Sequence, residues 1–348
     1  MLITVGAPTR GRIARWVKQL KRTELVEGNA MKINAKFAAA LVGALTFSGV
    51  AHASIAGPTP PPGETAGLDL ASPLPEGVYF VNIGSVGSLR SAKGEGAFDY
   101  NVPALVWSTP WNILGGRLTF LGAAPEVSLD SKSSLYARGI YNPLLAGQLR
   151  WNLGNGFSAS YLAGAYIGIT GTNLYAGGNL FVKDPLNETT FYQVLGLAWR
   201  HDGWNATANL KYGIVGDNGT SSPLLAAPPK KNADFFIYDL GLTKSLGRWE
   251  LGVVAYGSTM NSGSYSELRS ANFPYACSGC TQFALGGLVG YNFGPVITQL
   301  TVATDLYAHS DNNVLGAPWW PQKETRGVLR TIIPLWNPET PKAVAAKY

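Results

Sequence analysis

Apolar and polar side chains alternate with a period of two through most of the chain beyond residue 76. The segment 204–212 shows this most clearly: Trp, Ala, Ala, Leu and Tyr fall on one face, and Asn, Thr, Asn and Lys on the other. The segments 157–170 and 248–258 repeat the pattern. Because successive side chains of a strand point to opposite faces, each segment predicts a strand with one apolar and one polar surface.

Extended over the chain, this pattern predicts about twelve strands and no long stretch of helical period. The expected spans are 77–86, 100–109, 116–126, 142–153, 156–170, 189–201, 203–215, 233–246, 248–260, 281–293, 295–308 and 325–336.

The connections between these spans alternate in length. Short turns are expected at 110–115, 154–155, Asp202, Gly247 and Gly294, and long polar loops near 127–141, 171–188, 216–232, 261–280 and 309–324. Transmembrane barrels combine short periplasmic turns with long external loops, and a tilted strand crosses the hydrocarbon in about 9–11 residues. The chain is therefore predicted to be all-β, a transmembrane antiparallel up-and-down β-barrel spanning residues 73–336.

Aromatic residues and composition favour a membrane wall. Tryptophans recur near the ends of the expected strands, as interfacial girdles require: Trp107, Trp111, Trp151, Trp199, Trp204, Trp249 and Trp336. Charged residues make up 14% of the chain, aromatic residues 11%, and there are 42 glycines. A secreted soluble β-protein would share this composition, so the alternating loop lengths carry the distinction.

The segment 31–53 has the pattern of a secretory signal peptide. Lys32 and Lys36 precede an apolar run at 37–50, and Ala51-His52-Ala53 forms a cleavage site between Ala53 and Ser54. The alternative, a membrane anchor, would need an apolar run of about 20 residues. Residues 1–30 are then a mis-called start or an extended basic leader, 54–72 a Pro/Gly-rich linker or flexible periplasmic lead-in, and 337–348 a C-terminal tail.

Removal of the leader changes the charge of the protein. The first 53 residues carry eight of the 27 basic and two of the 21 acidic side chains, so nineteen of each remain. A basic chain would invite nucleic acid as a partner, but the mature chain is neutral and no such partner is expected.

Two cysteines, Cys277 and Cys280, form a single C-x-x-C pair. An exported chain meets an oxidising compartment, which favours a local disulfide. A redox motif would need a βαβ context, and a zinc site would need further ligands. We expect the disulfide, with no metal and no cofactor.

Five stretches resemble one family. They are Ser-Pro-Leu-Pro-Glu-Gly-Val-Tyr-Phe at 72–80, the segments 103–116 and 142–151, Gly-Leu-Val-Gly-Tyr-Asn-Phe-Gly-Pro at 287–295, and Ile-Ile-Pro-Leu-Trp at 332–336. Together they resemble the meta-pathway of phenol degradation family of outer-membrane proteins. The resemblance implies a porin-like barrel in the outer membrane of a Gram-negative bacterium that admits aromatic or other hydrophobic small molecules. It brings no catalytic or ligand motif with it.

In a barrel the function resides on the lumen face and in the loops. The period of two places eight charged residues inward, because charges are costly on the lipid face: Arg117, Arg150, Lys211, Asp239, Glu250, Asp305, Arg326 and Arg330. The uncharged inward candidates are Gln148, Asn205, Asn209, Tyr256, Gln299 and Tyr307. The basic excess would favour anions in an open lumen; alternatively, these charges pair across the interior and plug it.

Two aromatic loop segments, 273–275 and 318–321, could form a lid or simply pack over the mouth. Enzyme chemistry is not expected, because His309 and Ser310 are adjacent and would point to opposite faces of a strand.

The leading hypothesis is a passive or gated channel for small solutes. The alternative is a plugged structural barrel whose loops serve adhesion or complex assembly. The expected partners are outer-membrane lipid, a small-molecule solute and, during biogenesis, periplasmic chaperones and the barrel-assembly machinery.

Overall fold

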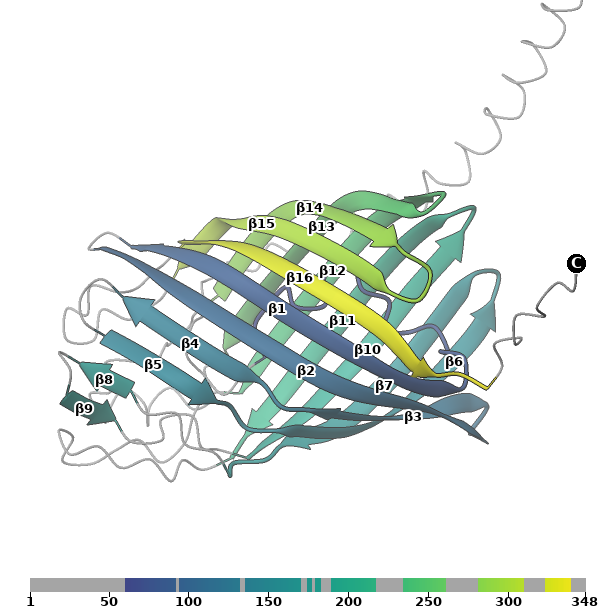
Figure 1. The fold of residues 1–348 in the computed structure, drawn as a ribbon, viewed down its shortest axis with the longest axis horizontal. Helices are drawn as coiled ribbons and strands as arrows, with labels where there is room; N and C mark the ends of the chain where they lie inside the picture. The colour runs from purple at the N-terminus through teal and green to yellow at the C-terminus, as the bar shows by residue number, and fades with distance from the viewer. Residues whose placement is uncertain are drawn as a thin grey trace, which may run out of the picture. The chain divides into compact units, whose positions relative to one another are not determined.

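The computed structural model describes residues 60–91, 94–131, 135–169, 174–176, 179–182, 189–216, 234–260, 281–309 and 323–338. Sixteen antiparallel strand segments in these ranges form one sheet (Figure 1). Within the described ranges, no helix is long and apolar enough to cross a bilayer.

Twelve strands close the barrel, and each corresponds to one of the expected spans. They are β1 (Gly77–Ser91), β2 (Gly94–Ile113), β3 (Gly116–Ala123), β6 (Leu144–Gly154), β7 (Phe157–Tyr166), β10 (Thr190–His201), β11 (Trp204–Val215), β12 (Phe235–Leu246), β13 (Trp249–Met260), β14 (Thr281–Asn292), β15 (Ile297–His309) and β16 (Lys323–Trp336).

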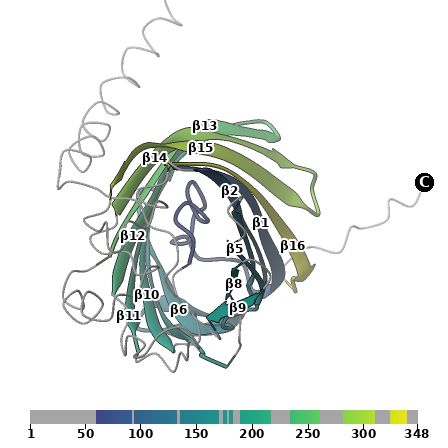
Figure 2. The same cartoon turned by 90° about the vertical axis from the view of Figure 1, so that its left-hand side faces the viewer.

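The ring closes where the first and last strands meet. β1 pairs with β16 along one edge and with β2 along the other, so the twelve strands form an unbroken cycle of hydrogen bonds (Figure 2). Closure removes the unpaired strand edges that a bilayer would penalise by several kcal/mol per orphan amide. The last strand ends at Trp336, as the sequence indicates.

Tight turns join strands at one end of the barrel. At Leu114-Gly115, Asn155-Gly156 and Asp202-Gly203 both central residues have positive φ, between 48° and 81°. This is the type I′ geometry whose twist matches that of paired strands. Leu114, Asn155 and Asp202 are the non-glycine residues with positive φ in the described ranges. All three therefore adopt the left-handed conformation that a two-residue type I′ hairpin requires.

Two regions expected to be loops contain strand segments, which corrects the prediction. The region 127–141 holds most of β4 (Glu126–Ser131) and β5 (Leu135–Ile140), and the region 171–188 holds β8 (Leu174–Ala176) and β9 (Asn179–Val182). The long strand β2 pairs with β3 near the tight turns and with β4 beyond them. Pro125 and Pro143 lie at the breaks, where a missing N–H interrupts the ladder and separates β3 from β4 and β5 from β6.

Candidate functional site: a plugged lumen

Residues Pro60–Ser72 lie inside the barrel, where Figure 2 shows the dark segment preceding β1 within the ring. This corrects the expectation of a flexible periplasmic lead-in for this part of the chain. Ala66 and Ala71 are fully buried, and successive turns are held by bonds from Ala66 N to the Gly63 carbonyl and from Leu68 N to the Thr65 carbonyl. We call the segment Pro60–Ser72 the plug.

A buried ion-pair cluster fixes the first part of the plug, around Glu64. Lys211 on β11 lies 2.8 Å from Asp239 on β12 and 3.0 Å from Glu64 of the plug, and its side chain has no exposed surface. Asp239 also accepts bonds from the Gly63 and Thr65 amides at 2.8 and 3.0 Å, and from the Thr65 hydroxyl at 2.7 Å. Lys211 thus pairs with two carboxylates, and Asp239 of the wall also binds the plug backbone.

Two arginines on β16 hold plug carbonyls. Arg326 donates to the Pro62 carbonyl at 3.0 Å, and Arg330 donates to the Ala66 carbonyl at 2.6 Å. Glu324, which is also buried, pairs with Arg326 at 2.7 Å. The rings of Phe98 and Tyr100 pack against the same guanidinium at 5.5 and 5.2 Å. Hydrogen bonds from charged donors are among the stronger ones in proteins, so these contacts restrain the plug tightly.

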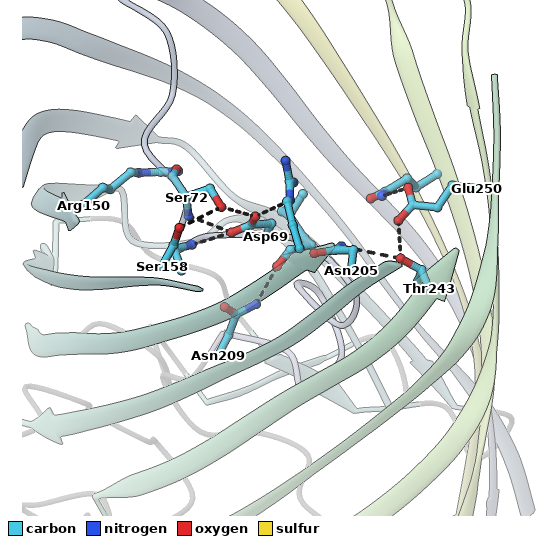
Figure 3. Close-up of polar contacts among 12 residues, drawn as sticks. Asp69, Ser72, Arg150, Ser158, Asn205, Asn209, Thr243 and Glu250 are labelled. Atoms are coloured by element: carbon cyan, nitrogen blue, oxygen red, sulfur yellow. Dashed lines mark hydrogen bonds and ion pairs between the residues drawn. The ribbon is translucent and has the colours of Figure 1, made fainter. Parts of the chain in front are cut away.

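Amide, hydroxyl and guanidinium side chains hold the rest of the plug. Figure 3 shows Asn209 and Arg150 reaching it from different strands. Asn209 bonds to the Thr65 and Leu68 carbonyls at 3.0 and 2.9 Å. Further along, the Leu70 carbonyl accepts from both Gln148 and Ser160.

The end of the plug is fixed close to the tight-turn end of the barrel. Arg150 reaches the Ser72 carbonyl at 3.1 Å, and Asp69 pairs with Arg200 at 2.7 Å. The plug therefore runs from the Arg326 level down toward the tight turns, where β1 begins.

Glycines allow the plug to lie directly on the wall. Gly63 and Gly67 have φ of 86° and 79°, a region that side chains disfavour. A Cβ added at Gly67 would lie 2.7 Å from a methyl of Leu288, and one added at Gly241 of the wall would lie 2.3 Å from Gly67 Cα. Plug and wall are thus in backbone contact at this level.

Five of the eight predicted charged residues contact the plug directly: Arg150, Lys211, Asp239, Arg326 and Arg330. The other three bond elsewhere. Glu250 accepts from Thr243 (Figure 3) and from Gln299. Asp305 accepts from Gln282 and the Glu324 amide, and Arg117 donates to the Thr109 carbonyl near a tight turn. Solute contact by any of the eight stays a prediction.

The sequence analysis missed the acidic partners on the plug, Glu64 and Asp69. They are the two charged residues of 54–72, a faint signal in a segment without periodicity. It also placed Tyr307 inward. A bulge between Phe283 and Ala284 shifts the register of β15, and Tyr307 is 37% exposed. Cys277, Cys280, Ala53, Ser54 and the aromatic loop segments 273–275 and 318–321 lie outside the described residues.

The inner wall changes character away from the tight turns. Four rings from successive parts of the wall, Tyr141, Tyr166, Tyr192 and Phe235, stand in a row with centroids 5.7, 5.3 and 6.5 Å apart. Leu144, Leu162, Val194, Val215 and Ile237 are buried with them in one apolar cluster. We call the four rings the aromatic ladder.

A closed antiparallel barrel with an apolar outer wall and with its buried charged side chains inside defines an outer-membrane β-barrel protein. The chain belongs to the family described as "Putative MetA-pathway of phenol degradation", whose model matches residues 76–308. No curated protein sequence matches the chain.

One solved outer-membrane channel shows the same fold, and two further barrels align with lower scores. The COG4313 outer membrane channel from Pseudomonas putida F1 aligns with a TM-score of 0.55 at 11% identity, covering 79% of this chain and 99% of that one. The translocator domain of the autotransporter NalP from Neisseria meningitidis gives 0.49 at 12% identity, covering 77% and 90%. The CymD monoaromatic hydrocarbon channel gives 0.38 at 9%, covering 75% and 89%.

Proposed function

We propose that this protein is an outer-membrane channel for small hydrophobic solutes, aromatic ones among them, and that the plug is its gate. Membership of the phenol-degradation family supports the proposal, as does the shared fold with an outer membrane channel. The aromatic ladder is the observation that carries it.

The ladder argues for a hydrophobic solute. A porin for hydrophilic molecules has a polar, water-filled interior. Here part of the inner wall is lined by a row of tilted aromatic rings and by aliphatic side chains. Aromatic pairs contribute about 0.5–1.5 kcal/mol beyond their buried area, so a ring-bearing solute would be favoured over a sugar of the same size.

The plug argues for a gate. A passage through this barrel must displace or rearrange Pro60–Ser72, whose contacts come from β6, β7, β11, β12 and β16. Most of these bonds end on backbone carbonyls, so they can be exchanged for water one at a time. The segment continues directly into β1 and stays tethered to the wall when it moves.

The test is solute flux through proteoliposomes containing the full-length protein. We expect a small aromatic alcohol to be released faster than a sugar of similar size, and faster than from liposomes without protein. A specific observation favours a second function: the plug is held inside the barrel by buried charged contacts, as a purely structural barrel would require. Equal and negligible flux of both solutes would support that structural function and overturn the channel.

A further inference from the structure

The outer wall carries a pocket whose lining includes charged and amide side chains, where lipid-facing side chains would be apolar. It has a volume of about 350 Å³ and lies over β2, β4 and β5. Two rows of paired residues line it: Asp99, Ser128 and Arg138 form one row, and Asn101, Glu126 and Ile140 form the other. We call it the outer-wall pocket.

The alternation of the strands places these side chains outside the barrel. Tyr100 and Val127, the neighbours of Asp99 and Glu126 along their strands, pack into the interior clusters with Ile83 and Val328. Since successive side chains point to opposite faces, the residues on either side of them face outward. Glu126 and Arg138 are exposed accordingly.

The pocket lies toward the outer leaflet. Asp99 is eight residues along β2 from the outward-facing Trp107 near the tight turns. At about 3.3 Å per residue and a tilt of about 40°, this is a rise of about 20 Å. The apolar band of such barrels is about 25 Å tall, so the pocket lies near its upper edge.

Other strands carry aromatic residues at this level. On β10, Phe191 lies eight residues before Trp199, and on β14, Phe283 lies eight residues before Tyr291. On β2 the corresponding position is Asp99. The sector formed by β2, β4 and β5 therefore replaces the aromatic girdle by acidic, amide and guanidinium groups, a change that calls for a polar ligand from the membrane.

We propose that the outer-wall pocket binds the phosphorylated sugar headgroup of lipopolysaccharide, the glycolipid of the outer leaflet. Arg138 would hold a phosphate through its planar, bidentate donors. Asp99 and Glu126 would hold a divalent cation that bridges to the same phosphate, as carboxylate oxygens commonly do with Mg²⁺ and phosphates. Asn101 and Ser128 would bond to sugar hydroxyls, and Ile140 would border the acyl chains.

The geometry of the pocket fits a shared anion-and-cation site. Asp99 is restrained by the Gly87 amide at 3.1 Å, and Asn101 by Asn82 at 2.9 Å. These two side chains are therefore fixed by the wall, while the exposed Glu126 and Arg138 can adjust to the ligand. The proposal does not rest on the proposed channel function.

The experiment is a titration of the purified full-length protein in detergent with lipopolysaccharide in millimolar Mg²⁺, followed by native mass spectrometry. We expect Arg138→Ala to weaken binding at least tenfold and Arg138→Lys to weaken it less. Lys323→Ala, which removes an exposed cation elsewhere on the wall, is the matched control and should bind normally. Heat-modifiable migration on gels checks that each barrel is folded.

Further arms identify the ligand. Dephosphorylated lipopolysaccharide, inorganic phosphate and vesicles of phosphatidylglycerol should bind weakly, and Asp99→Asn with Glu126→Gln should abolish the dependence on Mg²⁺. Equal binding by Arg138→Ala and Lys323→Ala would overturn the proposal. So would equal binding of phosphatidylglycerol, which would mark a general anionic-lipid surface, or tighter binding after the carboxylates are removed.

Discussion

The inner faces of β6, β7 and β10–β12 have two halves of opposite character. Toward the tight turns they carry Arg150, Ser160, Asn209 and Asp239, and a chain segment fills the space they enclose. Toward the other end the same strands carry three rings of the aromatic ladder, Tyr166, Tyr192 and Phe235. Polar groups buried on folding must find partners, whereas apolar ring carbons and aliphatic side chains do not. The polar half therefore suits a bound backbone segment, and the aromatic half suits contact with apolar groups.

Lys211→Met should disturb the polar half most. It leaves Glu64 and Asp239 buried without their cation, and breaking a buried pair in this way costs about 3–5 kcal/mol. We expect the plug to leave its seat and the open fraction in bilayer recordings to rise strongly. Lys244→Met, at the exposed end of β12, is the control. If both variants record like the unmodified protein, the lysine does not hold the plug.

Gly67→Ala should have a smaller effect. The left-handed backbone costs a side-chain-bearing residue about 1–2 kcal/mol, and the new methyl would also press on Leu288. Gly154→Ala has the same penalty at φ 84° in a turn with open space around it. Both variants should unfold at a lower temperature than the unmodified protein, whereas the conductance should increase in Gly67→Ala alone. Increased conductance in both would mean that general destabilisation opens the barrel.

Tyr192→Ala should change the aromatic half alone. Removal of one ring from the ladder should cost an aromatic solute about 0.5–1.5 kcal/mol, a loss of up to about tenfold in affinity. Flux of the aromatic solute should fall and that of a sugar should not. Phe191→Ala, the adjacent outward-facing ring, should leave both fluxes unchanged. A loss of flux in Phe191→Ala would place the solute path on the outside of the wall.

The difference between the halves also explains what the sequence could predict. Period-two alternation and tight turns follow from local residue identity, so all twelve barrel strands could be located, including β11 and its polar face at Asn209 and Lys211. The plug has no such period. Arg150, Asn209 and Arg330 bind it through backbone carbonyls, which every residue has, so its sequence carries little record of its position.

The sequence pattern did not predict the register irregularities, for a related reason. The bulge that turns Tyr307 outward depends on how neighbouring strands pair, and so does the pairing of β4 with β2 and of β5 with β4 beyond the prolines. A pattern within one strand does not specify those pairings, so the short strands β4 and β5 appeared as a loop.

The most direct test of the gated channel is planar-bilayer conductance of the protein with and without residues 60–71. The deletion removes Glu64 and Asp69 and leaves Lys211 and Arg200 on the wall without these partners. We expect a low or silent baseline in the unmodified protein and large, stable, anion-preferring steps after deletion. A folded, heat-modifiable deletion variant that stays silent would contradict the account, because a lumen that remains closed without its plug is not a gated channel.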